Sequence, residues 1–354
     1  MIKASIVGAT GYVATELLRL LNNHPEVELQ YLISKSSAGQ RLIDIYPQFS
    51  GSRFASYELK KYTDVDLTES DIVFTALPHG ISQEIVADIY KQDIKVIDMS
   101  GDYRYLDVDV YESWYNIKHS YPEIAEKAVY GLVELNREKI KAAKLVANPG
   151  CYVTASILGL LPLIERNVID VNSIIVDAKS GVSGAGKSLK HSLLYNEVHE
   201  NLKAYNVAKH RHTSEIEFIL NNVHKDTKNT SDMDDFSLIF TPHLIPIKRG
   251  ILSTIYTNTS DINSDKQLYD IYNEYYKEER YIQVFEDKMP EIKYVVGSNY
   301  CHIGLKFDER TGKIIIVSVI DNMIKGSAGQ AIQNMNLMFN IDETTGLEST
   351  AVFP

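Results

Sequence analysis

The sequence of 354 residues contains only two cysteines, Cys151 and Cys301, and a single tryptophan. So few cysteines exclude a disulfide framework and fit a reducing compartment, where each thiol is considered singly. Basic residues are also scarce, since 36 Lys and Arg stand against 47 Asp and Glu and leave a net charge of −11. An acidic surface repels polyanions, which argues against a nucleic-acid or anionic-membrane binder and leaves room only for a local basic pocket.

Long hydrophobic runs are absent as well. The longest covers residues 151–164 and is interrupted by Thr154 and Pro162, whereas a membrane span needs roughly 20 apolar residues. The N-terminus begins like a signal peptide, but Gly8 and Gly11 interrupt its apolar stretch. A buried first strand is therefore the better interpretation, and we expect a cytoplasmic protein.

The first hundred residues alternate between short apolar runs and helical patterns, which is typical of a parallel sheet covered on both faces. We therefore predict an α/β fold with a Rossmann-type dinucleotide-binding domain. The expected strands are residues 3–7, 27–33, 71–76 and 95–99, and the expected helices are residues 14–22 and 82–91.

Beyond Asn148 the expected strands gather late in the chain, which indicates a second domain of the α+β type with a mixed or antiparallel sheet. The polar residues 225–235 are predicted as a surface loop. The expected strands are residues 173–178, 236–240, 250–257, 294–296, 302–307 and 313–320, and the expected helices are residues 153–161 and 328–338.

The first chemical motif is GATGYVA at residues 8–14, between an expected strand and an expected helix. It is a variant of the dinucleotide fingerprint, in which glycine permits a tight turn and close approach of the backbone to a pyrophosphate. The helix that follows offers N–H groups and a partial positive charge to phosphates. After the second strand, residues 33–37 read ISKSS, hydroxyls around a lysine, where NAD-specific folds usually carry Asp or Glu. This pattern favours NADP.

The second motif is NPGCYVT at residues 148–154, where Cys151 follows a Pro-Gly turn at the start of an expected helix. A helix N-terminus favours thiolate over thiol and supplies backbone donors for a developing oxyanion. Cysteine is more often a small buried hydrophobic residue, and Cys301, inside an apolar strand pattern, fits that description. We predict that Cys151 is a nucleophile and that Cys301 belongs to the core.

A thiolate nucleophile needs a partner that handles protons. The segment KHRHT at residues 209–213 offers two histidines flanking an arginine, suited to acid–base chemistry and anion binding. His210 and His212 share a face if this segment is extended and do not if it is helical. A solvated surface position is the alternative for either histidine.

The segment SGVSGAGK at residues 180–187, followed by Ser188, matches the string of a nucleotide-binding phosphate loop. It follows a strand in mid-chain, and a dinucleotide turn already exists near the N-terminus. A glycine loop near the nicotinamide or the substrate is therefore favoured over an NTPase site.

Together these motifs resemble the N-acetyl-γ-glutamyl-phosphate reductases, NADPH-dependent enzymes of arginine biosynthesis. The similarity covers nearly the whole chain, and NPGCY, SGVSGAGK and HRHTSEI in this order are its specific signals. Further segments that carry it are SKSSAG from residue 34, ALPHG from 76, IDMSGDYR from 97, YGLVELNRE from 130, PHLIPIKRGI from 242 and DNMIKGSAGQAIQNMN from 321.

The resemblance implies NADPH-dependent reduction of N-acetyl-L-glutamyl 5-phosphate to N-acetyl-L-glutamate 5-semialdehyde and phosphate. Cys151 would form a thioester that takes a hydride, and His210 would be the acid–base partner, with His212 as the second choice. The implied substrate contacts are Arg104, Asn148, Lys187, Tyr205, His212 and Arg249. The implied cofactor contacts are Gly8, Thr10, Gly11, Tyr12, Val13, Ser34, Lys35, Ser37, Leu77, Pro78, Ser183, Gly184 and Asn322.

The resemblance also implies the domain organisation. Residues 1–147 and 321–354 would form the NADP-binding domain, and residues 148–320 the catalytic and dimerisation domain. Asn322 would bond near the nicotinamide, although asparagine is equally suited to cap the following helix. We expect a homo-oligomer, a dimer or tetramer, by analogy alone, and no metal ion.

Other functions remain open at this stage. A related semialdehyde dehydrogenase would use the same mechanism on aspartyl phosphate or an aminoadipyl analogue, because pocket shape sets the substrate length. An NADP(H)-binding regulator without turnover would not need Cys151 and its histidines. A cysteine hydrolase without a cofactor would leave residues 8–14 and 34–37 without a purpose.

Overall fold

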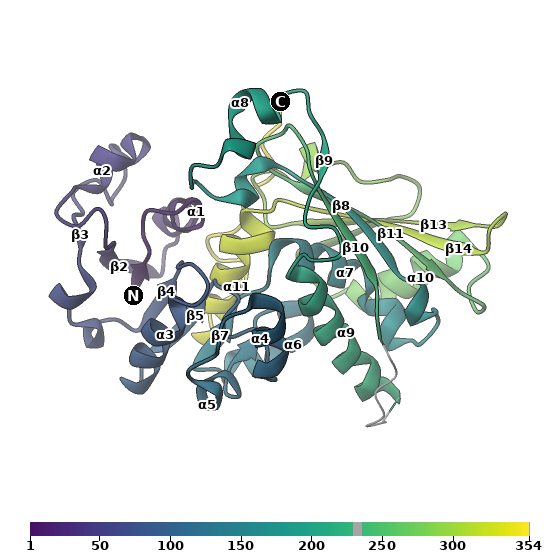
Figure 1. Cartoon of the computed structure of the whole chain (residues 1–354), viewed down its shortest axis with the longest axis horizontal. Coiled ribbons are helices and arrows are strands. Elements are labelled where there is room, and N and C mark those ends of the chain that lie inside the picture. Colours follow the sequence, from purple (N-terminus) through teal and green to yellow (C-terminus); the bar gives the residue numbers. More distant parts are fainter. Residues whose placement is uncertain (229–235, 354) are drawn as a thin grey trace. The chain divides into compact units, whose positions relative to one another are not determined.

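The computed structural model describes residues 1–228 and 236–353, and the chain divides into two compact units (Figure 1). Residues 1–149 and 327–348 form the first unit, and residues 150–326 with those from 349 onward form the second. The C-terminal part of the chain thus belongs partly to each unit.

The first unit is built on a seven-stranded sheet in the order β3-β2-β1-β4-β5-β7-β6, with every neighbouring pair parallel. The strands are β1 (Ile2–Val7), β2 (Val27–Ile33), β3 (Leu59–Lys60), β4 (Ile72–Thr75), β5 (Lys95–Asp98), β6 (Val129–Tyr130) and β7 (Leu145–Ala147). The helices are α1 (Tyr12–Asn22), α2 (Leu42–Ile45), α3 (Ser82–Lys91), α4 (Val108–Tyr115), α5 (Pro122–Ala125), α6 (Val133–Lys141) and α11 (Gly329–Met338). This order is that of a Rossmann-type sheet, and the predicted fold class is confirmed.

Both faces of this sheet are covered, as continuous apolar strands require. Val73 and Val96 pack with Val86 and Ile89 of α3 in one core cluster. Their chain neighbours on the sheet point the other way and are equally buried, as Phe74 shows with no exposed surface. Helix α11, which comes from the end of the chain, packs against α1 and α6.

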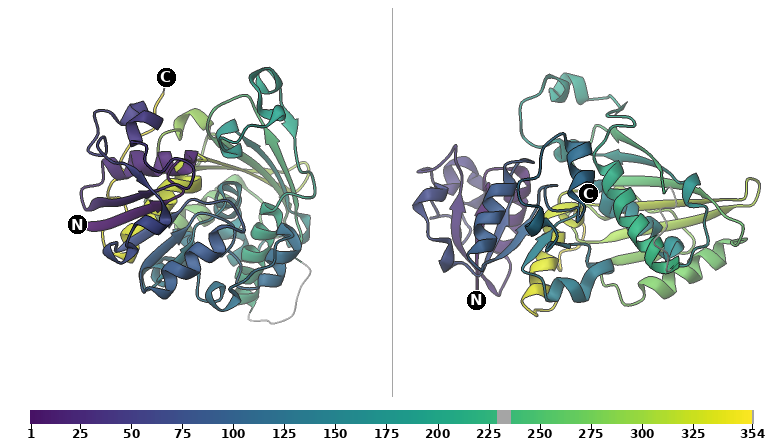
Figure 2. Two further views of the ribbon diagram at one scale, coloured as in Figure 1. Left: turned by 60° about the vertical axis from the view of Figure 1, so that its left-hand side comes forward. Right: turned by 60° about the horizontal axis from the view of Figure 1, so that its bottom comes forward.

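The second unit has a seven-stranded mixed sheet in the order β12-β13-β14-β11-β8-β10-β9. Figure 2 shows this sheet, coloured teal to yellow-green, from two further sides. Its strands are β8 (Ile175–Ser180), β9 (Lys203–Ala204), β10 (Ile239–Leu244), β11 (Ile251–Asn258), β12 (Ile282–Phe285), β13 (Cys301–Asp308) and β14 (Lys313–Ile320). Its helices are α7 (Cys151–Glu165), α8 (Tyr195–Val198), α9 (His212–Lys228) and α10 (Asp265–Tyr276). Helix α7 packs against β11 and β14, and α9 packs against α7.

Three sequence predictions fail locally in this unit. Residues 294–296 are not a strand: a 3-10 turn ends at Tyr294, and Gly297 follows with a φ of +92°. The apolar run is too short to pair, and Val295 is buried from a turn instead. The strand predicted at 236–240 lies at Ile239–Leu244, running through Pro242.

The predicted surface loop at 225–235 is wrong at its start. Residues 225–228 form the last turn of α9, where Lys225 and Lys228 complement the negative end of the helix dipole. Residues 229–235 lie outside the described residues. Cys301 is fully buried, so its prediction as a core residue is confirmed.

Candidate active site

Cys151 is the first residue of α7 and is half-buried. Gly150 is the N-cap and has an extended backbone, with φ −70° and ψ 146°. Its N–H donates to the carboxylate of Glu215 at 2.9 Å, and its carbonyl accepts the N–H of Thr154 at 2.9 Å. The turn before the cysteine is therefore fixed at both its donor and its acceptor. Backbone N–H groups of the first helical turn favour a thiolate at this position.

A pocket of about 410 Å³ opens at Cys151 within the second unit. It brings together four further residues predicted from sequence, Gly184, Tyr205, His210 and His212. The remaining lining residues are Tyr152, Ser180, Gly181, Ala185, Lys190, Ser192, Leu193, Lys203, Asn206, Arg211 and Leu244. The pocket mixes a thiol, imidazoles, phenols and cations, a composition suited to an anionic substrate.

The two histidines have different surroundings. A β-carbon added to Gly150 would lie 2.8 Å from Cδ2 of His212 and closer still to its Nε2, so this imidazole lies against the turn that carries Cys151. His210 instead accepts the backbone N–H of His212 at its Nδ1, at 3.1 Å. A neutral His210 ring therefore carries its proton on Nε2. Burial, assisted by the charge of Arg211, lowers the pKa of His210 to about 4.

Tyr205 belongs to a chain of hydroxyls at the pocket wall. Its hydroxyl donates to that of Tyr152 at 3.2 Å, and Tyr152 donates in turn to the carbonyl of His243 at 3.1 Å. Burial raises the pKa of Tyr205 to about 12 and raises that of Tyr152 further. Both phenols are therefore protonated donors at neutral pH.

Two predicted cationic contacts lie elsewhere in this unit. Neither Lys187 nor Arg249 lines the pocket of Cys151. Lys187 is exposed, and Nη1 of Arg249 lies 3.6 Å from the carboxylate of Asp321. Sequence reasoning passed over Lys190 and Lys203, which do line the pocket. They lie outside the motifs, between SGVSGAGK and KHRHT, and the folding of residues 187–204 brings them to the pocket.

The glycine loop after β8 is a 3-10 turn, Val182–Ala185, and not the start of a long helix. Asn322 organises it, since its Nδ2 donates to Ser183 Oγ at 2.9 Å and its Oδ1 accepts the Gly250 N–H at 2.7 Å. The cap of the helical turn that follows is the neighbouring Asp321, whose Oδ1 accepts the N–H of Met323 at 2.7 Å. Asn322 is therefore a loop anchor beside Gly184.

The dinucleotide motif in the first unit lies where the strand order reverses, between β1 and β4. Open α/β sheets bind ligands at the carboxyl ends of strands at such a point. Gly8 has a φ of +88°, and its N–H donates to the carbonyl of Ile33 at 2.9 Å. A β-carbon on Gly8 would lie 2.9 Å from the carbonyl carbon of Ala76 and closer still to its oxygen. Only glycine fits this turn, which agrees with a cradle for a pyrophosphate.

The other predicted cofactor residues of this unit surround that turn. Gly11 caps α1 without a side-chain bond, and Tyr12 and Val13 begin the helix. Leu77 and Pro78 follow β4, next to Ala76. Thr10 Oγ1 lies 3.5 Å from Ser34 Oγ at the end of β2.

Ser34 is buried, whereas Lys35 is exposed and Ser37 is half-buried. No acidic side chain lies among residues 33–37. The residues present fit a dinucleotide, and the hydroxyls and the lysine fit a 2′-phosphate better than a bare diol.

Arg104 and Asn148 meet at the same end of the sheet. Nε of Arg104 donates to the carbonyl of Asn148 at 2.8 Å, and both residues are buried. Asn148 also donates to the carbonyl of Ser327 at 3.0 Å and accepts from Asn334 at 3.2 Å. The turn that leads to Cys151 is therefore held by side chains from both ends of the chain.

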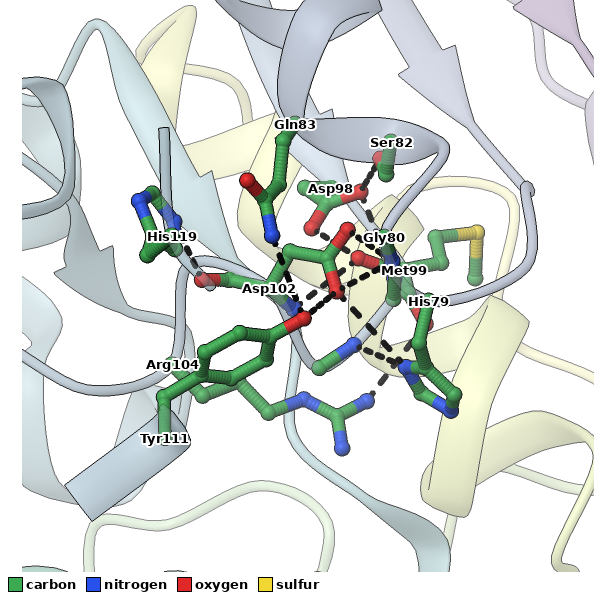
Figure 3. Close-up of polar contacts among 12 residues, drawn as sticks. His79, Gly80, Ser82, Gln83, Asp98, Met99, Asp102, Arg104, Tyr111 and His119 are labelled. Carbon is green, nitrogen blue, oxygen red and sulfur yellow. Dashed lines mark hydrogen bonds and ion pairs between the residues drawn. The ribbon is translucent and has the colours of Figure 1, made fainter. Parts of the chain in front are cut away.

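Sequence reasoning missed two buried carboxylates, Glu215 and Asp102. Glu215 accepts the Gly150 N–H, and its signal in the sequence was an acidic residue three positions after His212, in the first turn of a helix. Asp102 accepts the N–H of Gly80 and the hydroxyl of Tyr111 (Figure 3). Its signal was its place in the SGDYR segment, where only Arg104 was singled out.

Within residues 1–228 and 236–353 no group of His, Cys, Asp and Glu side chains is arranged to hold a metal ion. Over the same residues, no helix has the length and apolar character needed to cross a membrane.

Comparison with family models matches both units. Residues 3–143 match the semialdehyde dehydrogenase NAD-binding domain, and residues 151–322 match the semialdehyde dehydrogenase dimerisation domain. Fold and site thus define an oxidoreductase of the semialdehyde dehydrogenase class.

Full-length relatives narrow this class. The chain is 54% identical over 358 residues to an N-acetyl-gamma-glutamyl-phosphate reductase of Halothermothrix orenii, covering all of both chains. It is 50% identical to that of Caldicellulosiruptor bescii, with 98% of each chain covered, and 45% identical to that of Desulforudis audaxviator, with complete coverage of both. The chain belongs to the N-acetyl-gamma-glutamyl-phosphate reductase family.

Solved structures share the fold at low sequence identity. Aspartate semialdehyde dehydrogenase II of Vibrio cholerae superposes with a TM-score of 0.72 at 17% identity, over 96% of this chain and 98% of that one. The Candida albicans aspartate semialdehyde dehydrogenase, solved with NADP, gives a TM-score of 0.70 at 17% identity, with the same coverage.

Proposed function

We propose that this protein reduces N-acetyl-L-glutamyl 5-phosphate to N-acetyl-L-glutamate 5-semialdehyde with NADPH, as a step of arginine biosynthesis. The observation that carries the proposal is Cys151 at the N-terminus of α7, in a pocket with His210, His212 and Tyr205. The names of its full-length relatives support the same substrate.

The reaction begins when the Cys151 thiolate attacks the acyl carbon. The bond from that carbon to the phosphate oxygen breaks, phosphate leaves with the electron pair, and a thioester remains. Bound NADPH supplies a hydride for the thioester carbon. The resulting thiohemiacetal then loses its carbon–sulfur bond, which releases the aldehyde and regenerates the thiolate. Each step needs an oxyanion or thiolate stabilised near the start of α7.

The surroundings of the two histidines support His212 as the acid–base residue. Its ring lies against Gly150, one residue before the nucleophile. His210 has a lowered pKa and its Nδ1 is occupied, so at neutral pH it serves as an Nε2–H donor to the substrate. Replacing each histidine by glutamine tests this division, because loss of proton transfer lowers kcat, whereas loss of a donor mainly raises KM.

Substrate binding is assigned to cationic side chains and hydrogen-bond donors, which suit phosphate and carboxylate groups. Arg104, Asn148, Lys187, Tyr205, His212 and Arg249 are the contacts proposed from the family resemblance. The pocket adds Lys190, Lys203 and Arg211, which suit an anion in a chain of net charge −11.

The cofactor is assigned to residues at the carboxyl edge of the parallel sheet and, in the second unit, to the glycine loop and Asn322. Gly8, Thr10, Gly11, Tyr12 and Val13 would hold the pyrophosphate; Ser34, Lys35 and Ser37 would hold the 2′-phosphate; Leu77, Pro78, Ser183, Gly184 and Asn322 would contact the nicotinamide. Residues 1–147 and 321–354 are proposed as the NADP-binding domain and residues 148–320 as the catalytic domain. The family model of the second domain supports a homo-oligomer, a dimer or tetramer.

The decisive experiment measures NADP⁺ reduction with N-acetylglutamate semialdehyde and phosphate. We expect phosphate-dependent turnover that Cys151→Ser abolishes and the matched variant Cys301→Ser retains, since Cys301 is buried in the core. Aspartate semialdehyde is the control substrate. Turnover with that control alone would overturn the proposed substrate. Turnover that does not depend on phosphate would overturn the acyl phosphate as the substrate of the forward reaction, and turnover retained by Cys151→Ser would overturn the thioester mechanism.

A further inference from the structure

Asp102 is a fully buried carboxylate outside the pocket of Cys151. Its two oxygens accept the N–H of Gly80, at 3.0 and 2.8 Å, and one of them also accepts the Tyr111 hydroxyl at 2.9 Å (Figure 3). Gly80 has a φ of +82°, so the turn after β4 takes a left-handed conformation where the carboxylate meets it. One acidic side chain thus fixes this turn to the segment after β5.

A second bond joins the same two segments in the opposite direction. The N–H of Gly101 donates to Nδ1 of His79 at 2.9 Å, and that nitrogen lies 4.0 Å from Asp102. The backbone carbonyl of Asp102 accepts from His119 at 2.9 Å. Residues 77–80 and 99–104 are therefore cross-linked by side chains from both, and the carboxylate is the only charged acceptor among these bonds.

The turn after β4 adjoins the dinucleotide motif. Ala76 donates its N–H to Val7 at 2.8 Å, and its carbonyl lies where a side chain on Gly8 would be. Leu77 and Pro78 connect this contact to Gly80. Only four positions separate Gly80 from Ala76, which contacts the Gly8 turn of the proposed cofactor site. A shift of the Gly80 turn would therefore move the backbone beside Gly8.

The charge environment of Asp102 is unfavourable to its ionised form. Burial and the neighbouring Asp98 raise the pKa of Asp102 to about 6. The hydrogen bonds from Gly80 and Tyr111 and the charge of Arg104 lower this pKa and only partly offset the rise. Nδ1 of His79, a partly exposed side chain, lies 4.0 Å from the same carboxylate.

Two further titratable rings line this cluster. Burial lowers the pKa of His119, and burial with Asp98 and Asp102 raises that of Tyr103. Asp98 has donors of its own, the hydroxyls of Thr75, Ser82 and Ser100. Keeping Asp102 ionised therefore costs folding stability. If this position served the fold alone, a neutral side chain of the same shape would fill it without that cost.

We propose that ionised Asp102 is a positioning residue of the cofactor site, holding the Gly80 turn in the arrangement that binds NADP(H). Protonated Asp102 keeps one carbonyl-type acceptor and loses its charge, so the turn is held less firmly. This inference rests on the proposed function, because it assumes that the Gly8 edge binds NADP(H).

The test is the dissociation constant of NADP⁺, measured by calorimetry at intervals from pH 5.5 to pH 8 for wild type and Asp102→Asn. The 2′-phosphate titrates in the same range, so the ratio of the two constants at each pH is compared, which cancels the ionisation of the ligand. We expect Asp102→Asn to bind about tenfold more weakly at pH 8, the effect of losing a charged hydrogen bond. The ratio should fall to about three at pH 5.5, where a carboxyl with a pKa of about 6 is still about one quarter ionised.

Two further variants make the result specific. Tyr111→Phe removes a donor that favours the ionised carboxylate, so the pH at which the NADP⁺ dissociation constant changes should be higher than in the wild type. Because this variant keeps Asp102, it also tests the proposal if Asp102→Asn does not fold. Asp109→Asn, an exposed aspartate of α4, should bind like wild type at every pH.

The outcomes separate the two proposals. A ratio that is constant with pH, or equal to one at pH 8, would overturn the positioning role while leaving NADP(H) binding intact. Failure of the wild type to bind NADP⁺ would overturn the proposed function, and this inference with it.

Discussion

The imidazole of His212 lies so close to the backbone of Gly150 that no β-carbon fits between them. Gly150 is also the N-cap of α7 and donates its N–H to Glu215. One glycine thus sets the entry of the helix that carries Cys151 and the position of the imidazole beside it.

Gly150→Ala should therefore displace His212 while leaving the fold in place. We expect kcat/KM to fall about a hundredfold, since small misplacements of catalytic groups have effects of this size. The melting temperature should change by only a few degrees, which corresponds to a change of about 1 kcal/mol in the unfolding free energy of a chain of this length. Activity close to wild type would show that the His212 ring is not needed where it lies.

The two cysteines should differ in reactivity. Cys151 is half-buried at a helix N-terminus, whereas Cys301 is fully buried with its sulfur 3.5 Å from Ser318 Oγ. Iodoacetamide should modify Cys151 at least about tenfold faster in the folded protein, because the thiolate is the reactive form and access is required. Peptide mass spectrometry measures both rates, and equal rates would count against an activated Cys151.

Gly8→Ala should weaken NADP⁺ binding without affecting the thiol. A side chain there combines a positive φ with a collision against Ala76, so the turn must move. We expect a dissociation constant at least about tenfold higher, with an unchanged alkylation rate at Cys151. Gly51→Ala is the matched control, because a β-carbon at Gly51 meets nothing within 4 Å.

His210 should make stability depend on pH. Burial lowers its folded-state pKa to about 4 from the ordinary 6.5, so the folded protein binds fewer protons than the unfolded chain between these values. Its contribution is complete above pH 6.5 and is lost as the pH falls toward 4. Between pH 7 and pH 5 the unfolding free energy of His210→Gln should therefore fall by about 1–2 kcal/mol less than that of the wild type. Urea unfolding measures it, with the exposed His191→Gln as the control; equal slopes in all three proteins would contradict this.

Asp102 should change the unfolding free energy with pH in the opposite direction to His210. Its folded-state pKa is raised to about 6 from 3.8, so its ionisation costs stability as the pH rises between these values. Asp102→Asn should then equal or exceed the wild type in unfolding free energy at pH 8, by on the order of 1 kcal/mol, and lose that advantage near pH 4. A variant that is clearly less stable at pH 8 would mean that the carboxylate serves the fold itself.

Much of the fold could be predicted from residues close together in the chain. Four parallel strands of the first unit, β1, β2, β4 and β5, carry continuous apolar runs, and each was predicted within about two residues of its position. The short strands β3, β6 and β7 were not predicted, because two or three residues give no periodic pattern. The short run at 294–296 misled because three apolar residues occupy a turn as readily as a strand. The strand at β10 was misplaced because Pro242 interrupts its pattern, although the strand continues through it.

Local sequence alone determined the two backbone features on which the proposed chemistry depends: a glycine turn between strand and helix, and a cysteine after Pro-Gly at a helix start. Both depend on backbone conformation over a few residues, which short motifs encode. Tertiary structure alone decided which groups surround them. Glu215 reaches Gly150 across 65 positions and Asp102 reaches Gly80 across 22, because carboxylates taken from water must meet N–H donors wherever the fold brings them.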